Sequence, residues 1–178
     1  MKMMTNVFLL LLFLITLVAS LSLSPKYYMK IAMIEAKKAY NIGEVPVGAV
    51  VFLPATPASP EIISSAHNLV ESTFDATAHA ELLALRATAQ KVGNWRLINA
   101  TVFTTLEPCV MCIRAMEAFR VKKVVYAGRD LRLGGVESCD EPFPKNAFHS
   151  VETEALPLDN NFAVESSSLM KSFFRARR

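Results

Sequence analysis

Three residues with the chemistry of a metal site lie at the starts of two predicted helices. His79 belongs to the stretch TAHAELLAL, and Cys109 and Cys112 belong to PCVMC. Cysteines three positions apart share one face of a first helical turn, with Cβ atoms about 5–6 Å apart, so both sulfurs can bind one ion. A helix start also favours thiolates, because unpaired N–H groups and the positive end of the dipole face them. The spacing therefore predicts a zinc site on His79, Cys109 and Cys112.

The number of protein ligands decides what such a site does. A structural zinc ion is closed by four protein ligands, whereas a hydrolytic one keeps its fourth position for water. Cys139, in a Gly-rich loop, is the remaining candidate for a fourth ligand, and a redox or core cysteine pair is the alternative. Glu81 favours hydrolysis, because a carboxylate two positions beyond His79 can stand beside a bound water as general base and then general acid. His-x-Glu together with Pro-Cys-x-x-Cys is typical of zinc deaminases.

The predicted elements bring the two helix starts to one edge of a sheet. Strands are expected at residues 44–52, 62–68, 100–106, 122–128 and, in short form, 150–153. Helices are expected at residues 25–40, 78–90, 108–119 and 162–177. Pro46 places the first strand at an edge or a bulge, and Pro108 is expected at the first position of its helix. The order predicts an α/β fold, a three-layer α/β/α sandwich with a mixed, mostly parallel five-stranded sheet.

Composition indicates one globular domain, expected at residues 25–178. The chain has 178 residues, of which 52% are hydrophobic and 20% are charged, enough for a substantial core. The formal net charge is only +3, and the segment from residue 162 to the end supplies all of it, with one acid, Glu165, against four bases: Lys171, Arg175, Arg177 and Arg178. A basic tail on a neutral body favours a nucleic-acid partner over a membrane. The alternative is a solvated helix end whose arginines face the negative end of the dipole.

The first 24 residues have the order of a signal peptide. Lys2 precedes an apolar run at residues 7–19, and small residues follow it. The run is short for a membrane span, although an uncleaved signal anchor is the alternative. Entry through the secretory route, for example to a plastid-type organelle, is therefore expected, with a cytoplasmic or a membrane-anchored protein as the alternatives. With three cysteines in the chain, no disulfide framework is expected, and the mature domain is expected to have no stable membrane association.

Six segments resemble the bacterial-type tRNA-specific adenosine deaminases, within the zinc-dependent cytidine and deoxycytidylate deaminase superfamily. They are EVPVGAV, TAHAE, NWRLINAT, TLEPCVMC, GRDLRLGG and SFFRARR, and they span nearly the whole domain. The last two discriminate best, because free-base and free-nucleoside deaminases share the zinc motif alone. The resemblance implies a single deaminase domain of the cytidine deaminase-like fold, one zinc ion per subunit and a homodimer.

The resemblance also implies a reaction, the hydrolytic conversion of adenosine to inosine at the wobble position of a tRNA anticodon stem-loop. Glu81 would carry the protons and Asn68 would hydrogen-bond the purine. The N–H of Ala80 would face the attacked carbon, and Asp130 would lie near the anticodon sugar. For the neighbouring bases and phosphates the implied contacts are Phe173, Phe174, Arg175, Arg177 and Arg178. One phenylalanine of the pair is expected to point into the core.

Two alternatives stay open at this point. A deaminase of a free base or nucleoside (cytosine, guanine or cytidine) shares the zinc motif, and the basic aromatic tail is the feature against it. A non-catalytic zinc-binding partner subunit is the second, and Glu81 argues against it because a scaffold needs no proton carrier. Ile113 and Arg114 stand where the family has small residues, which leaves the pocket wall or subunit contact there open. His67 is expected to end its strand rather than line the pocket.

Overall fold

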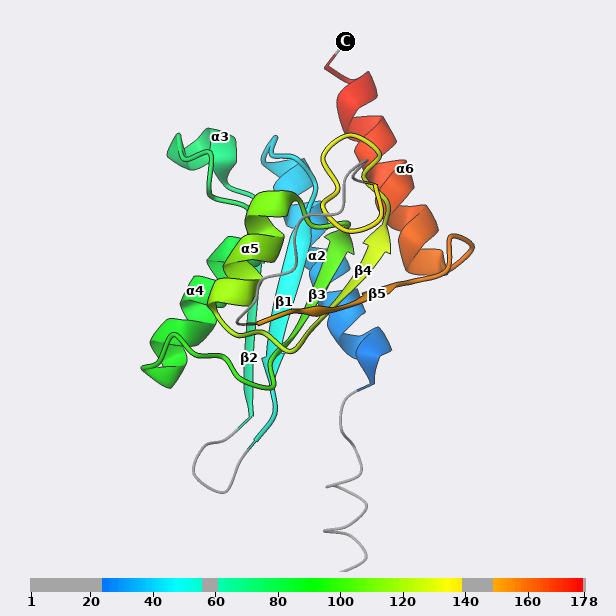
Figure 1. The fold of residues 1–178 in the computed structure, drawn as a ribbon. Helices are drawn as coiled ribbons and strands as arrows, with labels where there is room; N and C mark the ends of the chain where they lie inside the picture. Colours follow the sequence, from blue (N-terminus) through cyan, green and yellow to red (C-terminus); the bar gives the residue numbers. More distant parts are fainter. Residues whose placement is uncertain (1–23, 56–60, 139–148, 178) are drawn as a thin grey trace, which may run out of the picture.

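A computed structural model of the chain describes residues 24–55, 61–138 and 149–177. Its centre is a five-stranded sheet of order β2-β1-β3-β4-β5 (Figure 1). The strands are β1 (Gly48–Leu53), β2 (Ile62–His67), β3 (Thr101–Leu106), β4 (Lys123–Gly128) and β5 (Glu152–Ala155). β1 pairs antiparallel with both β2 and β3, while β3, β4 and β5 pair in parallel. Four strands therefore run in one direction and β1 runs against them, which confirms the mixed, mostly parallel sheet.

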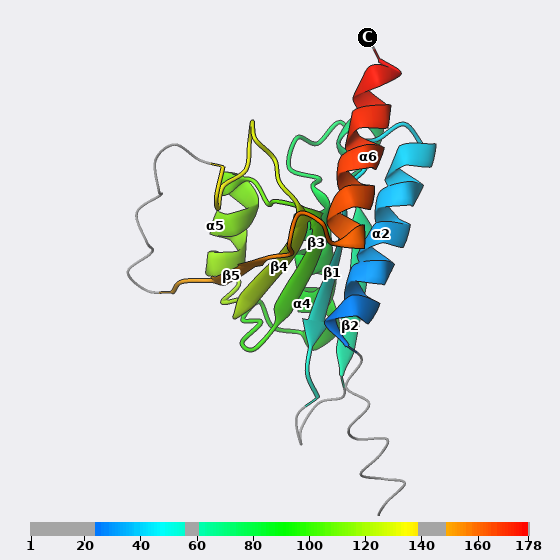
Figure 2. The same cartoon turned by 90° about the vertical axis from the view of Figure 1, so that its right-hand side faces the viewer.

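Helices cover both faces of this sheet. α2 (Pro25–Asn41) and α6 (Asn161–Arg175) pack together on one face, and α4 (Ala80–Val92) and α5 (Val110–Ala118) pack on the other (Figure 2). The predicted three-layer α/β/α sandwich is thus confirmed. α3 (Val70–Thr73) is a short helix between β2 and α4 that the sequence pattern did not predict. Within the described ranges, none of the helices combines the length and the apolar character that crossing a membrane requires.

The strands are buried on alternate sides, because successive side chains of a strand point to opposite faces. In β1, Ala49 and Val51 join the core under α4 and α5, whereas Val50 packs under α2. Gly48 begins the strand where α2 lies closest. A Cβ atom at Gly48 would meet the carbonyl oxygen of Ala32 at 2.1 Å, so α2 can approach the sheet this closely only at a glycine.

Two expectations about proline are wrong. β1 is an interior strand, and Pro46 lies before its first residue, where no ladder hydrogen bond is needed. Pro108 also lies outside its helix, because Cys109 is the N-cap of α5. The remaining boundaries agree with the sequence to within two residues at most ends, and Gly93 ends α4 in a left-handed conformation. Cys139 and residues 1–23, where the signal peptide is predicted, lie outside the described residues.

Candidate active site

The site lies at one edge of the sheet, where β2, β3 and β4 all end. These strands run in the same direction, so the segments that follow them meet at their carboxyl ends. Asn68 follows β2 directly, Cys109 comes three residues after β3, and Asp130 two residues after β4. His79 and Cys109 are the N-caps of α4 and α5. Strand direction therefore gathers side chains that are distant in the sequence.

His79, Cys109 and Cys112 form a metal-ligand cluster. The Nδ1 atom of His79 lies 3.6 Å from Cys109 Sγ and 3.5 Å from Cys112 Sγ, and the three ligand atoms lie within 4.8 Å of one another. Tetrahedral zinc, with Zn–S bonds of about 2.3 Å and Zn–N bonds of about 2.0–2.1 Å, needs nitrogen and sulfur about 3.6 Å apart. The donor set and its spacing therefore fit a zinc ion bound by three protein ligands.

The protons of the cluster are unevenly shared. The pKa of the Cys109 thiol falls to about 4, because Cys112 donates a hydrogen bond to its sulfur and His79 lies beside it. The pKa of Cys112 rises, because its proton serves Cys109 and because the side chain is buried. The pKa of His79 rises as well, because Cys109 is its hydrogen-bond partner. These protons are the ones that a zinc ion would displace on binding.

Glu81 lies beside the cluster and is buried, with 3% of its surface exposed. Its Oε1 accepts a hydrogen bond of 3.1 Å from Thr104 Oγ1, and its Oε2 lies 3.7 Å from the sulfur of Cys112. Burial raises the pKa of this carboxyl above its ordinary value. A carboxyl held next to the ligands and inclined to keep a proton is suited to proton transfer rather than to metal binding.

Asn68 is also buried in the site, at 5% exposed. Its Oδ1 accepts a hydrogen bond of 2.9 Å from the backbone N–H of Ala80. The expectation that this N–H faces the attacked carbon therefore needs correction, because in this structure it serves Asn68. With its oxygen taken, Asn68 presents its NH₂ group as a donor to the pocket that it lines.

Two adjoining cavities lead to the site. The first, which we call the zinc pocket, has a volume of about 200 Å³ and is lined by His79, Glu81, Cys109 and Asn68, among others. The second, the basic groove, has a volume of about 480 Å³ and is lined by one acid, Asp130, and by four bases: Arg129, Arg132, Lys171 and Arg175. The two cavities share Leu106, Asp130, Arg132, Met170 and Phe174. An anionic chain in the basic groove would therefore reach the zinc pocket directly.

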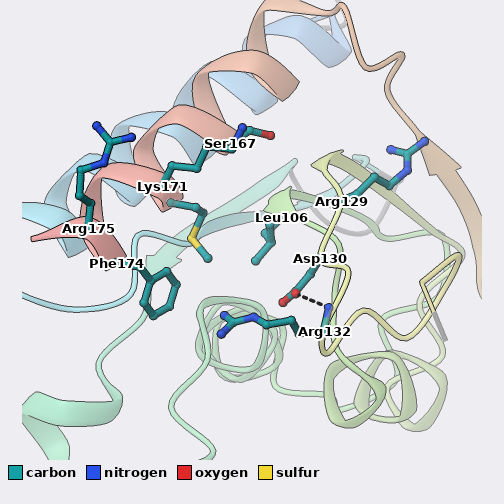
Figure 3. A pocket seen from close by; sticks show the side chains of 9 residues that line it. Leu106, Arg129, Asp130, Arg132, Ser167, Lys171, Phe174 and Arg175 are labelled. Carbon is teal, nitrogen blue, oxygen red and sulfur yellow. Dashed lines mark hydrogen bonds between the residues drawn. The ribbon is translucent and has the colours of Figure 1, made fainter. Parts of the chain in front are cut away.

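The C-terminal helix divides its predicted contacts between these cavities and the core. Phe174 lines both cavities, and the Arg132 guanidinium lies 4.9 Å from the centre of its ring; Figure 3 shows the two side chains pointing toward each other. Phe173 is instead buried and packs edge-on against Tyr40, which confirms that one phenylalanine points inward. Arg175 lines the basic groove.

Arg177 is engaged elsewhere. Its guanidinium lies 3.6 Å from the centre of the Phe173 ring and donates a hydrogen bond of 2.7 Å to the carbonyl oxygen of Gly43. Arg177 therefore fastens the end of α6 to the loop after α2 instead of facing the groove. Arg178 lies outside the described residues.

The loop after β4 belongs to the GRDLRLGG segment, and it lines both cavities with Asp130, a predicted site residue, and with Arg132. Asp130 Oδ1 accepts the N–H groups of Arg132 and Leu133, which closes a tight turn at the pocket. Further lining residues that the sequence reasoning missed are Val45, Val47, Glu71 and Met170. Glu71 belongs to α3, whose four residues are too few for a helical period to appear.

Three other positions from the sequence analysis make contacts outside the zinc pocket. His67 ends β2 as predicted, and its Nδ1 lies 2.7 Å from Glu35 Oε2. Ile113 packs against the core under α4 and α5. Arg114 forms an ion pair of 2.6 Å with Glu117 on the same helix.

An α/β/α sandwich with a His/Cys/Cys cluster at two helix starts and a buried glutamate beside it defines the class of zinc-dependent deaminases. Residues 23–128 match the model of the cytidine and deoxycytidylate deaminase zinc-binding region. The chain belongs to this family.

The chain is most usefully compared with three known proteins. The chain is 40% identical over 157 residues to a tRNA-specific adenosine deaminase of Aquifex aeolicus (strain VF5), covering 86% of this chain and 95% of that protein. A solved structure from work on A-to-I editing by tRNA:A34 deaminases at the wobble position is 30% identical, with a TM-score of 0.70, and covers 81% of this chain and 99% of that one. A guanine deaminase from Nitrosomonas europaea, 21% identical with a TM-score of 0.66 and 84% of each chain covered, shares the fold.

Proposed function

We propose that this protein converts adenosine to inosine at the wobble position of tRNA anticodon loops, by hydrolysis. The observation that carries the proposal is the buried carboxyl of Glu81, 3.7 Å from the sulfur of Cys112, in a pocket that joins a groove with four bases. The tRNA-specific adenosine deaminase of Aquifex aeolicus, at 40% identity, supports the same substrate.

Glu81 moves the protons of the proposed reaction. When bound by His79, Cys109 and Cys112, zinc lowers the pKa of a water molecule to about 7 and so provides a nucleophile at neutral pH. Glu81 Oε2 accepts the proton of the attacking water, gives it to N1 of adenine, and then helps to protonate the amino group that leaves as ammonia. The balance is adenosine plus water to inosine plus ammonia. The raised pKa of Glu81 suits both directions of transfer.

Asn68 and the pocket walls orient the base. The NH₂ group of Asn68 is the donor that can recognise an acceptor atom on the purine edge, since its Oδ1 is fixed by Ala80. The same bond couples base recognition to the start of α4, the helix that carries Glu81. A base bound by Asn68 is thereby held in register with the proton carrier.

The basic groove is proposed to bind the RNA on either side of the reacting nucleotide. An anticodon loop is unpaired, so exposing one base costs little and its neighbours can stack on side chains. The Phe174 ring, with the Arg132 guanidinium 4.9 Å from its centre, offers such a stacking surface. Lys171 and Arg175 lie in the groove at a position to pair with phosphates.

A homodimer is the proposed assembly, as the resemblance to the tRNA-specific enzymes implies. Sedimentation equilibrium of the purified protein tests this directly: a mass near twice the monomer's 19.7 kDa is expected, and a monomer at assay concentration would contradict it.

Residues 1–24 are proposed to act as a signal peptide or signal anchor. Imaging of the full-length chain and of a chain starting at residue 25, each with a C-terminal fluorescent tag, separates the alternatives. Different compartments for the two are expected, and identical diffuse fluorescence would remove the leader from targeting.

One experiment tests metal, reaction and substrate together. The purified protein is analysed for bound zinc and incubated with anticodon stem-loop RNA, which is then sequenced for inosine. About one zinc per chain and inosine at the wobble position are expected. Parallel incubations with guanine, cytosine and cytidine test the other enzyme class, and zinc without any turnover would point to a partner subunit.

A further inference from the structure

Glu107 is a second buried glutamate at the site, 2% exposed, and the proposed reaction does not use it. Its Oε1 accepts backbone N–H groups from Val136, Glu137 and Ser138 at 3.1, 2.8 and 2.9 Å. Its Oε2 accepts the N–H of Asp130 at 3.2 Å and the hydroxyl of Ser138 at 2.6 Å. All five donors belong to residues 129–138, which we call the Asp130 loop.

The Asp130 loop is also fitted closely against the metal-ligand segment. Gly134 forms a β-bridge with Cys109, and the N–H of Gly135 donates to the carbonyl oxygen of Pro108 at 2.9 Å. A Cβ atom at Gly134 would lie 2.4 Å from the Glu107 carboxyl carbon, so the loop and the carboxylate leave no space between them. The loop is therefore packed directly against the segment that carries Cys109, with Glu107 between them.

This loop forms one wall of both cavities. Asp130 and Arg132 line the zinc pocket and the basic groove, and Leu133 lines the zinc pocket. Arg132 also faces Phe174. Glu107 also lines the zinc pocket, but both of its carboxylate oxygens accept hydrogen bonds from the loop, so the carboxylate contacts the segment that carries these lining residues.

We propose that Glu107 is a positioning residue, which holds the Asp130 loop in its RNA-binding position and thereby sets the affinity for substrate. The proposal rests on the proposed function, since it assumes that RNA binds along the loop. Glu107 has two possible roles: it positions the Asp130 loop, or it supports the nearby metal ligands. Loss of the first role raises KM, whereas loss of the second lowers zinc content and kcat.

Glu107→Gln is the direct test, because glutamine keeps the shape of the side chain. Whichever way its amide turns, an NH₂ group faces either the N–H of Asp130 or the three N–H groups that Oε1 now accepts. We expect KM for anticodon stem-loop RNA to rise about tenfold while kcat changes by less than about twofold. Bound zinc should be unchanged, and the amides of the Asp130 loop should exchange hydrogen faster in deuterium exchange.

Gly134→Ala disturbs the same contact from the loop side and keeps the test valid if the first variant folds poorly. It should raise KM in the same way, and the double variant should be less than additive, since both changes break one contact. Glu117→Gln is the matched control, because Glu117 is a buried glutamate on α5 paired with Arg114, outside both cavities. Its KM and loop exchange should equal those of the unchanged protein.

The outcomes separate this inference from the proposed function. An unchanged protein that forms no inosine defeats the proposed function, whatever the variants do. An active protein whose Glu107→Gln variant keeps its KM and loop exchange, or loses zinc and kcat instead, overturns the positioning role. Hydrogen exchange is measured without substrate. If the Asp130 loop stays protected in Glu107→Gln, the positioning role is therefore contradicted even when no activity can be measured.

Discussion

Two buried glutamates at the site have opposite pKa shifts, and their hydrogen-bond donors explain the difference. Burial raises the pKa of Glu81, and the hydrogen bond from its own backbone N–H, the neighbouring His79 and the hydroxyl of Thr104 do not reverse this shift. Burial opposes ionisation of Glu107 as well, but the hydroxyl and N–H of Ser138, with other loop N–H groups, outweigh it and lower the pKa. One carboxyl is therefore ready to hold a proton, and the other stays ionised as an acceptor.

Glu81→Gln is expected to abolish turnover while leaving the site intact. Glutamine cannot carry the proton, so kcat should fall by about 10²–10⁴-fold, the usual contribution of general acid–base catalysis. Zinc content and RNA affinity should stay the same, because Glu81 is outside the ligand cluster. Metal analysis, RNA binding and inosine sequencing check the three quantities. Inosine formation at the unchanged rate would refute the role of Glu81.

At the scale of one helix, two adjacent residues of α6 have different roles: Phe173 stabilises the fold and Phe174 lines the proposed RNA site. Phe173→Ala should lower the free energy of unfolding by about 3 kcal/mol, because it removes a buried ring that packs on Tyr40 and Arg177. Phe174→Ala should leave the unfolding midpoint nearly unchanged and raise KM for RNA about tenfold, because this ring lines the cavities. Urea unfolding and steady-state kinetics on both variants check this, and equal effects of the two on KM would contradict it.

The short helix α3 depends on another buried carboxylate, that of Glu44. Glu44 Oε1 accepts the N–H and the hydroxyl of Ser72 at 2.7 and 2.6 Å, and its Oε2 accepts the N–H of Glu71 at 3.2 Å. Burial of Glu44 opposes its ionisation, but the bonds from Ser72 outweigh this and hold the pKa below its ordinary value of 4.5. Glu44 thus holds α3, whose Glu71 lines the zinc pocket.

The lowered pKa of Glu44 predicts a pH-dependent stability. Its contribution is complete above the unfolded value of 4.5 and is lost as the pH falls from there through the lower folded pKa. Glu44→Gln should therefore cost about 1–3 kcal/mol at neutral pH, and the difference from the unchanged protein should shrink below pH 4.5. Urea unfolding over this range measures it. Glu152→Gln, at an exposed position of β5, is the control, and a constant difference for Glu44→Gln would contradict the linkage.

Across the whole molecule, local patterns predict the sheet and name the three residues of the metal cluster. The Val-rich run around Val50 predicts a strand, and the three-residue spacing of Cys109 and Cys112 matches the helical period. Both signals are local, so they hold whatever the rest of the fold is. β2 and β3 run in the same direction, because each is antiparallel to β1. The segments that follow these two strands therefore meet at one edge of the sheet, and this brings His79 to the cysteines.

Contacts between residues that are far apart in the sequence could not be predicted from it. The sequence around Phe173 and Phe174 does not predict which of the two rings packs inward. In the fold, Phe173 packs against Tyr40, a residue from the other end of the chain. No role is predicted for Glu44 or Glu107 from the sequence, and only the folded loops show that their oxygens are acceptors for backbone N–H groups. Pro46 misled for a similar reason, since a strand becomes interior through partners that lie far away in sequence.

The charge of the molecule is small overall, +3, and its placement predicts how salt affects RNA binding. The basic groove has four bases and one acid, so RNA binding there should release counterions, and log Kd should depend linearly on log salt concentration. Each phosphate contact on a single strand contributes about 0.7 to that slope, so Lys171→Ala and Arg175→Ala should each lower it by about this amount.

Arg177→Ala is the matched control for the salt dependence, because Arg177 is bound to Phe173 and the carbonyl of Gly43 instead of lining the groove. It should weaken the helix end and leave the slope unchanged. Point substitutions are required here, since deleting residues 171–178 would also remove the buried Phe173. Fluorescence anisotropy with labelled anticodon stem-loop RNA over a salt series gives the slopes. If Arg175→Ala keeps the full slope while Arg177→Ala lowers it, RNA runs over the end of α6 and not through the basic groove.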